Sequence, residues 1–265
     1  MFNKIIHPVD LSESISDIKI KSSFITTLGS REIILVHVLN PGLGSREQAR
    51  SRLSHLTQEL GEFDINARFR LCSGHVASEI ARAAEEEQTD GIYMPASAKN
   101  FLVSSLMGSV THDVLRLSEK PVFVHKQRPV LTETENLKKV VFATDFGEAA
   151  KRVWPYIKML GAFVSELIIL HVGKRAADPY TEQIRRENVQ ARMDKLQDKF
   201  QDDFKSIKSY SRIGSPARHI IQATEDTDAE LVALGRMNEP FPSMILGSTS
   251  SRVTAGVKSS VLLIP

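Results

Sequence analysis

Two stretches decide the fold of this chain: Lys4-Ile5-Ile6-His7-Pro8-Val9-Asp10 and, 135 residues further on, Lys139-Val140-Val141-Phe142-Ala143-Thr144-Asp145. Each is an apolar run that ends in an aspartate, which is typical of a buried strand in a parallel sheet. Because the second stretch repeats the first so far downstream, the chain is expected to contain two copies of one domain.

The segments that follow the two stretches repeat in the same order. The matched pairs are 34–38 with 168–172, 72–77 with 212–217, 107–110 with 246–249, and 120–124 with 259–263. Their offsets are 134, 140, 139 and 139 residues, so the two copies differ by small loop insertions. A solenoid repeat has a period of only ~20–50 residues, which excludes that architecture.

Length and composition agree with two ordinary globular domains. The chain has 265 residues, 42% hydrophobic and 25% charged, and its net charge is +2. That charge leaves no basic excess for nucleic acid, and no apolar run reaches the ~20 residues of a membrane span. The single cysteine, Cys72, excludes an internal disulfide, and the N-terminus does not resemble a secretory signal. We therefore expect a cytoplasmic protein that binds neither nucleic acid nor membrane.

Hydrophobic periodicity predicts strands that alternate with helices in both copies. The strands are expected at 5–9, 33–38, 67–71, 91–94 and 122–124, and at 140–144, 167–172, 206–211, 231–234 and 261–264. Helices are expected between a cap at Ser12 and a stop at Gly29, then at 48–60, 76–87 and 109–117, and at 148–160, 180–204, 217–224 and 249–255. This alternation favours an α/β fold with a parallel sheet.

Three elements, each present twice, carry a resemblance to a known family. They are the strand that ends in aspartate, the strand that ends in His37-Val38 or His171-Val172, and the glycine loop, Gly-Ser, helix and final strand. In this order the chain resembles the universal stress protein family in its tandem form. The resemblance implies two Rossmann-like domains, 1–128 and 136–265, each a five-stranded parallel sheet with helices on both faces. It also implies that the domains pair through their last strands, within one chain or in a homodimer.

Family members that bind ATP carry a loop of Gly, two residues, Gly, nine residues, Gly, then Ser or Thr. Glycines let the backbone approach phosphates, and the free N–H groups at a helix start attract anions. In the first copy the first two glycine positions hold Pro95 and Ala98, so we expect this site to be degenerate although Gly108 and Ser109 remain. The second copy keeps Gly235 and Gly247, with Asn238 at the middle position. Pro240 and Pro242 and a spacing one residue short depart from the pattern.

The second copy is therefore the candidate site for ATP or AMP, with or without Mg²⁺. By family position the site residues are Ala143, Thr144, Asp145, Val172, Gly235, Arg236, Asn238, Gly247, Ser248, Thr249 and Ser250. Each has a simpler interpretation: Asp145 as a cap for the helix after Phe146, Arg236 as a solvated loop charge, and Gly247-Ser248 as a plain helix start. His37 and His171 are expected to be packed or hydrogen-bonded at strand ends.

Two functions from different classes stay open. One is a stress-response sensor or adaptor that holds an adenine nucleotide, and the other is a ligand-free signalling or scaffold protein that acts through protein contacts. Three motifs that would indicate an enzyme are absent from the sequence: a P-loop lysine, a nucleophile elbow and a His/Cys/Asp cluster at metal-binding spacing. A slow ATPase is a third interpretation, for which the sequence supplies no general base with a partner.

Overall fold

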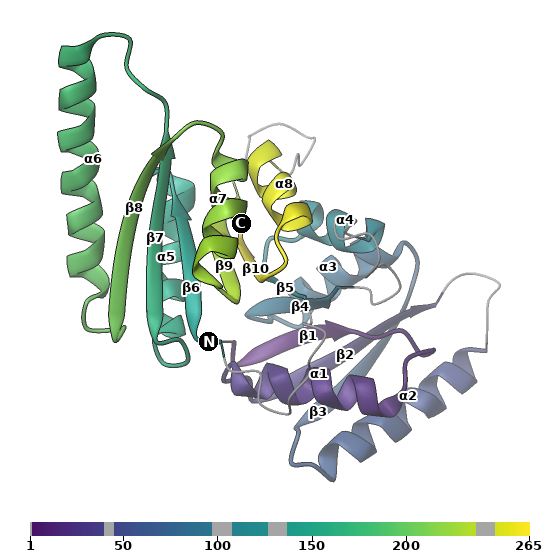
Figure 1. The fold of residues 1–265 in the computed structure, drawn as a ribbon. Coiled ribbons are helices and arrows are strands. Elements are labelled where there is room, and N and C mark those ends of the chain that lie inside the picture. The colour runs from purple at the N-terminus through teal and green to yellow at the C-terminus, as the bar shows by residue number, and fades with distance from the viewer. Residues whose placement is uncertain (1, 40–44, 97–107, 127–136, 237–246) are drawn as a thin grey trace. The chain divides into compact units, whose positions relative to one another are not determined.

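The computed structural model of the chain describes residues 2–39, 45–96, 108–126, 137–236 and 247–265. The chain folds into two compact units, the first built from β1 to β5 and the second from β6 to β10 (Figure 1). The domain boundaries that we predict, at 128 and 136, fall inside the undescribed stretch 127–136 and stay a prediction.

The first unit is a parallel sheet with strand order β3-β2-β1-β4-β5. Its elements in chain order are β1 (Lys4–Pro8), α1 (Ile15–Thr27), β2 (Glu32–Leu39), α2 (Arg46–Gly61), β3 (Ala67–Ser73), α3 (Val76–Glu86), β4 (Gly91–Pro95), α4 (Ser109–Leu117) and β5 (Val122–His125). Helices α3 and α4 contact each other and lie on the face opposite to α1 and α2 (Figure 1).

The second unit repeats this topology with strand order β8-β7-β6-β9-β10, again all parallel. Its elements are β6 (Lys139–Thr144), α5 (Glu148–Leu160), β7 (Glu166–Gly173), α6 (Pro179–Phe200), β8 (Ser206–Ile213), α7 (Pro216–Thr227), β9 (Leu231–Gly235), α8 (Ser248–Gly256) and β10 (Ser260–Ile264). Helices α7 and α8 pack together on one face, and α5 lies behind the sheet (Figure 1). The predicted α/β class and the shared strand order are confirmed.

The cores explain why the apolar runs become strands. The central strands are buried on both faces, and in each unit the first strand contributes side chains with no exposed surface, such as Ile5 and Ile6, or Val140 and Val141. Continuous apolar runs suit parallel strands because helices cover both faces of such sheets.

Several helix limits differ from the predicted ones by one to four residues, and two of the differences have a clear cause. The cap of α1 is Ser14 and not Ser12, since the Ser14 side chain accepts the Asp17 N–H. Gly29 follows the last turn with φ 85°, as expected for a glycine stop. Helix α6 ends at Phe200 and not at 204, because the chain turns at 201–203 and the buried Phe204 follows that turn before β8. None of the helices that the structure describes is both long and apolar enough to span a membrane.

Candidate functional site

The carboxyl ends of the parallel strands gather the predicted site residues at one edge of the second sheet. Strand β6 lies between β7 and β9, so the strand order runs from β6 to β7 and β8 on one side and from β6 to β9 and β10 on the other. In open α/β sheets this switch point is where ligands bind. Ala143 and Thr144 end β6, Val172 lies near the end of β7, and Gly235 ends β9. Helix α8 begins at the same edge, since it leads back to the start of β10.

Asp145 is held in a tight turn directly after β6. Its Oδ1 accepts the Gly147 N–H at 2.8 Å, and the Thr144 Oγ1 accepts the Phe146 N–H at 2.9 Å. Phe146 adopts φ 63°, a left-handed conformation that costs energy for an aromatic residue. The Asp145 side chain is exposed, and its Oδ2 has no hydrogen bond from the residues that the structure describes. The carboxylate therefore stabilises the turn with one oxygen and presents the other at the edge.

His171 fixes this turn from the neighbouring strand. Its Nδ1–H donates to the Thr144 carbonyl oxygen at 2.9 Å, and its ring stacks on Phe146 with centroids 4.5 Å apart. The Arg192 guanidinium of α6 lies 5.6 Å from the Phe146 ring centroid. Burial lowers the pKa of His171, so the imidazole is neutral at physiological pH. His171 is thus packed and hydrogen-bonded, as the sequence suggested.

Gly235 has a packing role that its place in a phosphate-binding pattern does not reveal. A Cβ at this position would lie 2.2 Å from the carbonyl oxygen of Ala149, in the first turn of α5. No side chain fits there without moving the α5 backbone. The glycine therefore lets α5 approach β9 closely, which is sufficient reason for it in the structure.

Arg236 is buried, with 6% of its surface exposed, so its interpretation as a solvated loop charge was wrong. Its backbone N–H donates to the Ile264 carbonyl at 2.6 Å. Its carbonyl accepts the Arg152 Nη2 at 2.8 Å, while the Arg152 Nε donates to the Pro265 carbonyl at 2.6 Å. The cation of Arg152, which sequence reasoning missed, thereby joins α5 to the ends of β9 and β10.

Gly247 and Ser248 open α8 without a side-chain cap. Gly247 is the N-cap residue, and no atom of the part of the chain that the structure describes lies within 4 Å of a Cβ built on it. Ser248 is exposed, Thr249 is half-buried, and Ser250 is buried. The uncapped N–H groups of the first turn and the open space before them suit an anion. Asn238, Pro240 and Pro242 lie outside the described residues.

The first domain has the same edge with different groups. His37 Nδ1 donates to the Val9 carbonyl at 3.0 Å, and Asp10 Oδ1 accepts the Ser12 N–H at 2.9 Å. Strand β4 ends in Pro95, where β9 has Gly235. Gly108 is the N-cap of α4, as Gly247 is of α8. Ala98 lies outside the described residues.

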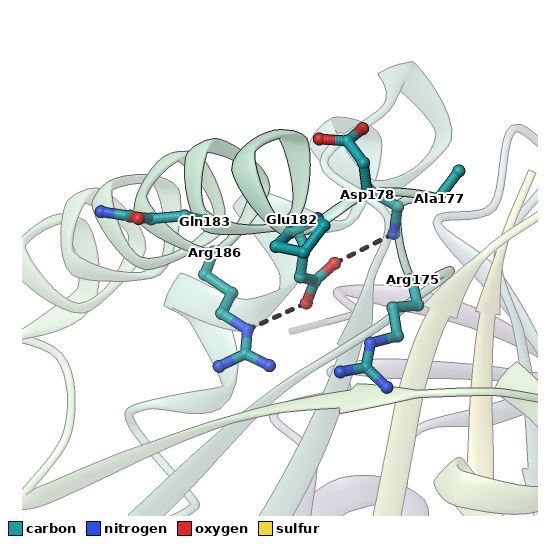
Figure 2. Close-up of a pocket in the computed structure, with 8 residues that line it drawn as sticks. Arg175, Ala177, Asp178, Glu182, Gln183 and Arg186 are labelled. Carbon is teal, nitrogen blue, oxygen red and sulfur yellow. Dashed lines mark hydrogen bonds and ion pairs between the residues drawn. The ribbon is translucent and has the colours of Figure 1, made fainter.

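A hollow of about 640 Å³ lies beyond the end of β7, at the start of α6 (Figure 2). It is lined by Arg175, Ala176, Ala177, Asp178, Pro179, Glu182, Gln183 and Arg186. Glu182 is buried and accepts the Ala176 N–H at 3.0 Å, two bonds from Arg185 and one from Arg186, each at 2.9 Å. These partners hold the pKa of its carboxyl far below the usual range. The hollow contains none of the predicted site residues, and its central charge is already neutralised.

Phe146 and Arg192 complete the turn around Asp145, and sequence reasoning assigned neither of them a role. An aromatic residue directly after the strand-ending aspartate was the available signal for Phe146. The contact of Arg192 depends on how α6 packs and could not be predicted. Within the described ranges, no group of three or more His, Cys, Asp or Glu side chains is placed to hold a metal.

Comparisons with known proteins identify the fold and the family. Residues 30–126 and 136–265 match the model of the universal stress protein family. A universal stress protein of Methanocaldococcus jannaschii is 28% identical over 158 residues, which cover 48% of this chain and 97% of that protein. The crystal structure of a universal stress protein from Archaeoglobus fulgidus has a TM-score of 0.74 at 24% identity, covering 99% of this chain and 98% of its own. One from Pseudomonas aeruginosa, described as putative in its name, has a TM-score of 0.73 at 17% identity, covering 99% and 93%.

Proposed function

The chain belongs to the universal stress protein family in tandem form, and from this premise we propose that it is a nucleotide-binding sensor or adaptor whose second domain holds ATP or AMP. The observation that supports this proposal is the arrangement at the switch point of the second sheet. There Asp145, with its free Oδ2, directly follows β6, and α8, whose start has no side-chain cap, is the helix that comes after the neighbouring strand β9.

The chemistry of these groups suits a nucleoside phosphate. A carboxylate oxygen at the strand end accepts hydrogen bonds from a ribose diol, and free N–H groups at a helix start bind phosphate oxygens. Asp145 thus binds the ribose, and Gly247, Ser248, Thr249 and Ser250 bind phosphate. Ala143, Thr144 and Val172 form the floor beneath the base. Gly235 serves the site indirectly, since α5 already occupies the space that its missing side chain leaves.

Arg236 and Asn238 belong to the proposal in different ways. Arg236 follows β9 and brings a buried cation to the edge, where it neutralises phosphate charge. Asn238 stands at the middle glycine position of the family pattern, and its role is carried over from that pattern alone.

The first domain is proposed to bind nucleotide much more weakly. Pro95 fixes its own φ and has no N–H to offer. A calorimetric titration of the whole protein with ATP is expected to show no more than one tight site per chain. Asp145→Ala and Gly247→Val should each abolish it, while Asp10→Ala, the matched change in the first copy, should leave it intact. The reverse result would assign the site to the first domain.

A scaffold that acts through protein contacts without a ligand is the alternative. Loss of the middle glycine and the packing role of Gly235 favour it. Native mass spectrometry of the purified protein distinguishes the two, because a retained adenine nucleotide would add a defined mass. The same measurement reports whether the chain forms a homodimer.

A further inference from the structure

The core of the first domain contains a histidine that the second domain does not have. His7 lies in β1 with no exposed surface. Its counterpart in the second domain, 135 residues later, is Phe142 in β6, which is equally buried. The strand partners support this match. His7 pairs with Leu35 and Phe142 pairs with Ile169, and these two partners occupy matching positions of the repeated strands β2 and β7. The two domains therefore place an ionisable and an apolar ring at one position of one fold.

The His7 ring is buried without a hydrogen bond from the residues that the structure describes. Neither Nδ1 nor Nε2 has a partner among them. The ring packs edge-on against Tyr93 of β4, with centroids 5.0 Å apart. A buried donor without a partner costs free energy even when it is neutral. A phenylalanine, as in the second domain, would avoid that cost.

The groups around His7 oppose a positive charge on it. Lys21 of α1 is the cation that acts on it most, and Glu13 is paired with Lys21. His125 of β5 hydrogen-bonds the Tyr93 hydroxyl and stacks on Phe24 with centroids 4.1 Å apart. The two titratable groups that act on His7 most are Lys21 and His125, and neither is an acid. A proton on His7 would thus be buried beside one lysine and a second histidine, without a counter-ion.

We propose that the core of the first domain is acid-sensitive: protonation of His7 is compatible only with an opened β1, so mild acid loosens the first domain at a position where the second domain is inert. The device uses neither the nucleotide site nor its residues. It would add an acid response of the first domain to a chain whose second domain is proposed to hold the nucleotide.

The sign and size of the response follow from linkage. Burial lowers the pKa of His7 to about 3, from the ordinary value of 6.5. The opened state therefore binds a proton below pH 6.5, whereas the closed state does not bind it until the pH approaches 3. The stability of the first domain against opening is lost as pH falls between these two values. One proton of difference changes the opening equilibrium tenfold per pH unit. Because the opened state is already half protonated at pH 6.5, the opening of β1 should increase roughly 16-fold between pH 6.5 and 5.0.

Hydrogen exchange of the full chain, read by mass spectrometry at pH 6.5 and 5.0 and corrected for intrinsic exchange, tests this. Amides of β1 and β4 should show the roughly 16-fold increase in opening. His7→Phe should remove it and slow their exchange at both pH values. His55→Gln, an exposed histidine of α2 in the same domain, is the matched control and should change nothing. An unchanged pH response in His7→Phe would overturn the proposal.

The reciprocal substitution, in the second domain, gives a second and independent test of the proposal. Phe142→His places the ionisable ring in the second domain, where the sole tryptophan, Trp154 of α5, reports unfolding by its fluorescence. The second domain should then lose stability toward acid more steeply than it does in the wild-type chain. His171 is present in both chains, so its own titration cancels from the comparison. Equal pH dependence in both would also contradict the proposal.

Discussion

His171 donates its Nδ1–H to the carbonyl oxygen of Thr144 and thereby ties the end of β7 to the end of β6. His37 makes the same bond to Val9 in the first domain. Each histidine fixes the residue just before a strand-ending aspartate, so the His-Val element of the family pattern has a structural meaning in both copies. The second copy adds the Phe146 ring, which His171 holds from one face.

His171→Phe is expected to destabilise the second domain by about 1–2 kcal/mol, since it leaves the buried Thr144 carbonyl without this donor. Hydrogen exchange should show faster opening of β6 and β7 amides. His37→Phe is the matched control and should act on β1 and β2 instead. If His171→Phe left the exchange of β6 unchanged, the bond would not support the Asp145 turn.

Gly235→Ala should destabilise the second domain by roughly 1–3 kcal/mol, because the new methyl group would meet the Ala149 backbone and push α5 away. Gly247→Ala is the matched change at an open position, and it should lower the free energy of unfolding by only about 0.5–1 kcal/mol, the preference of a helix N-cap for Gly over Ala. Trp154 fluorescence measures both. Equal midpoints for the two variants would show that α5 adjusts freely and that the close approach is unimportant.

The sequence predicted the fold well because the repeat checks each strand against its copy. It placed the strands from Val140 and from Leu231 to within one residue, since a buried apolar run is a local signal. It could not predict that the Ala149 backbone leaves no room for a side chain at position 235, or that Arg236 is buried. Both features depend on how α5 packs on the sheet. Tertiary contacts of this kind produce no periodic pattern of residues in the sequence.

Glu182→Gln should loosen the start of α6 at neutral pH, because the amide cannot neutralise Arg185 and Arg186. The pKa of the Glu182 carboxyl is depressed in the folded protein, so its contribution is present above the ordinary value and is lost as pH falls below it. The stability difference from wild type should therefore shrink below about pH 4. Glu187→Gln, on the exposed side of α6, is the control for urea titrations at pH 7 and about pH 3, which lies well inside the window of loss. A difference that does not shrink at the lower pH would contradict the assignment.

Pairing of the two domains along residues 122–124 and 261–264 stays a prediction from the sequence. These segments form β5 and β10, each of which ends its own sheet order. Sheet edges are usually paired or covered. Backbone NOEs between the two strands in the labelled protein would demonstrate the pairing. Rapid amide exchange along both strands would argue against it.

An adenine nucleotide in the second domain is expected to be held and not rapidly hydrolysed. Hydrolysis needs a positioned water and a cation that stabilises the developing charge on the phosphates. The described edge offers the N–H groups and hydroxyls of Ser248 and Thr249, with Arg236 as the proposed cation, but the chain has no P-loop lysine. Asp145 already uses one oxygen to accept the Gly147 N–H.

Donors that bind the ground state and the transition state equally well give affinity without a faster chemical step. Phosphate release from the wild-type protein with ATP and Mg²⁺ should therefore stay far below the ~10 per second of an ordinary enzyme. Asp145→Ala serves as the control for contaminating ATPase, because it should lose the nucleotide and leave any contaminating rate unchanged. A turnover near the enzymatic range that disappears in Asp145→Ala would make this site catalytic, and the sensor interpretation would then have to be abandoned.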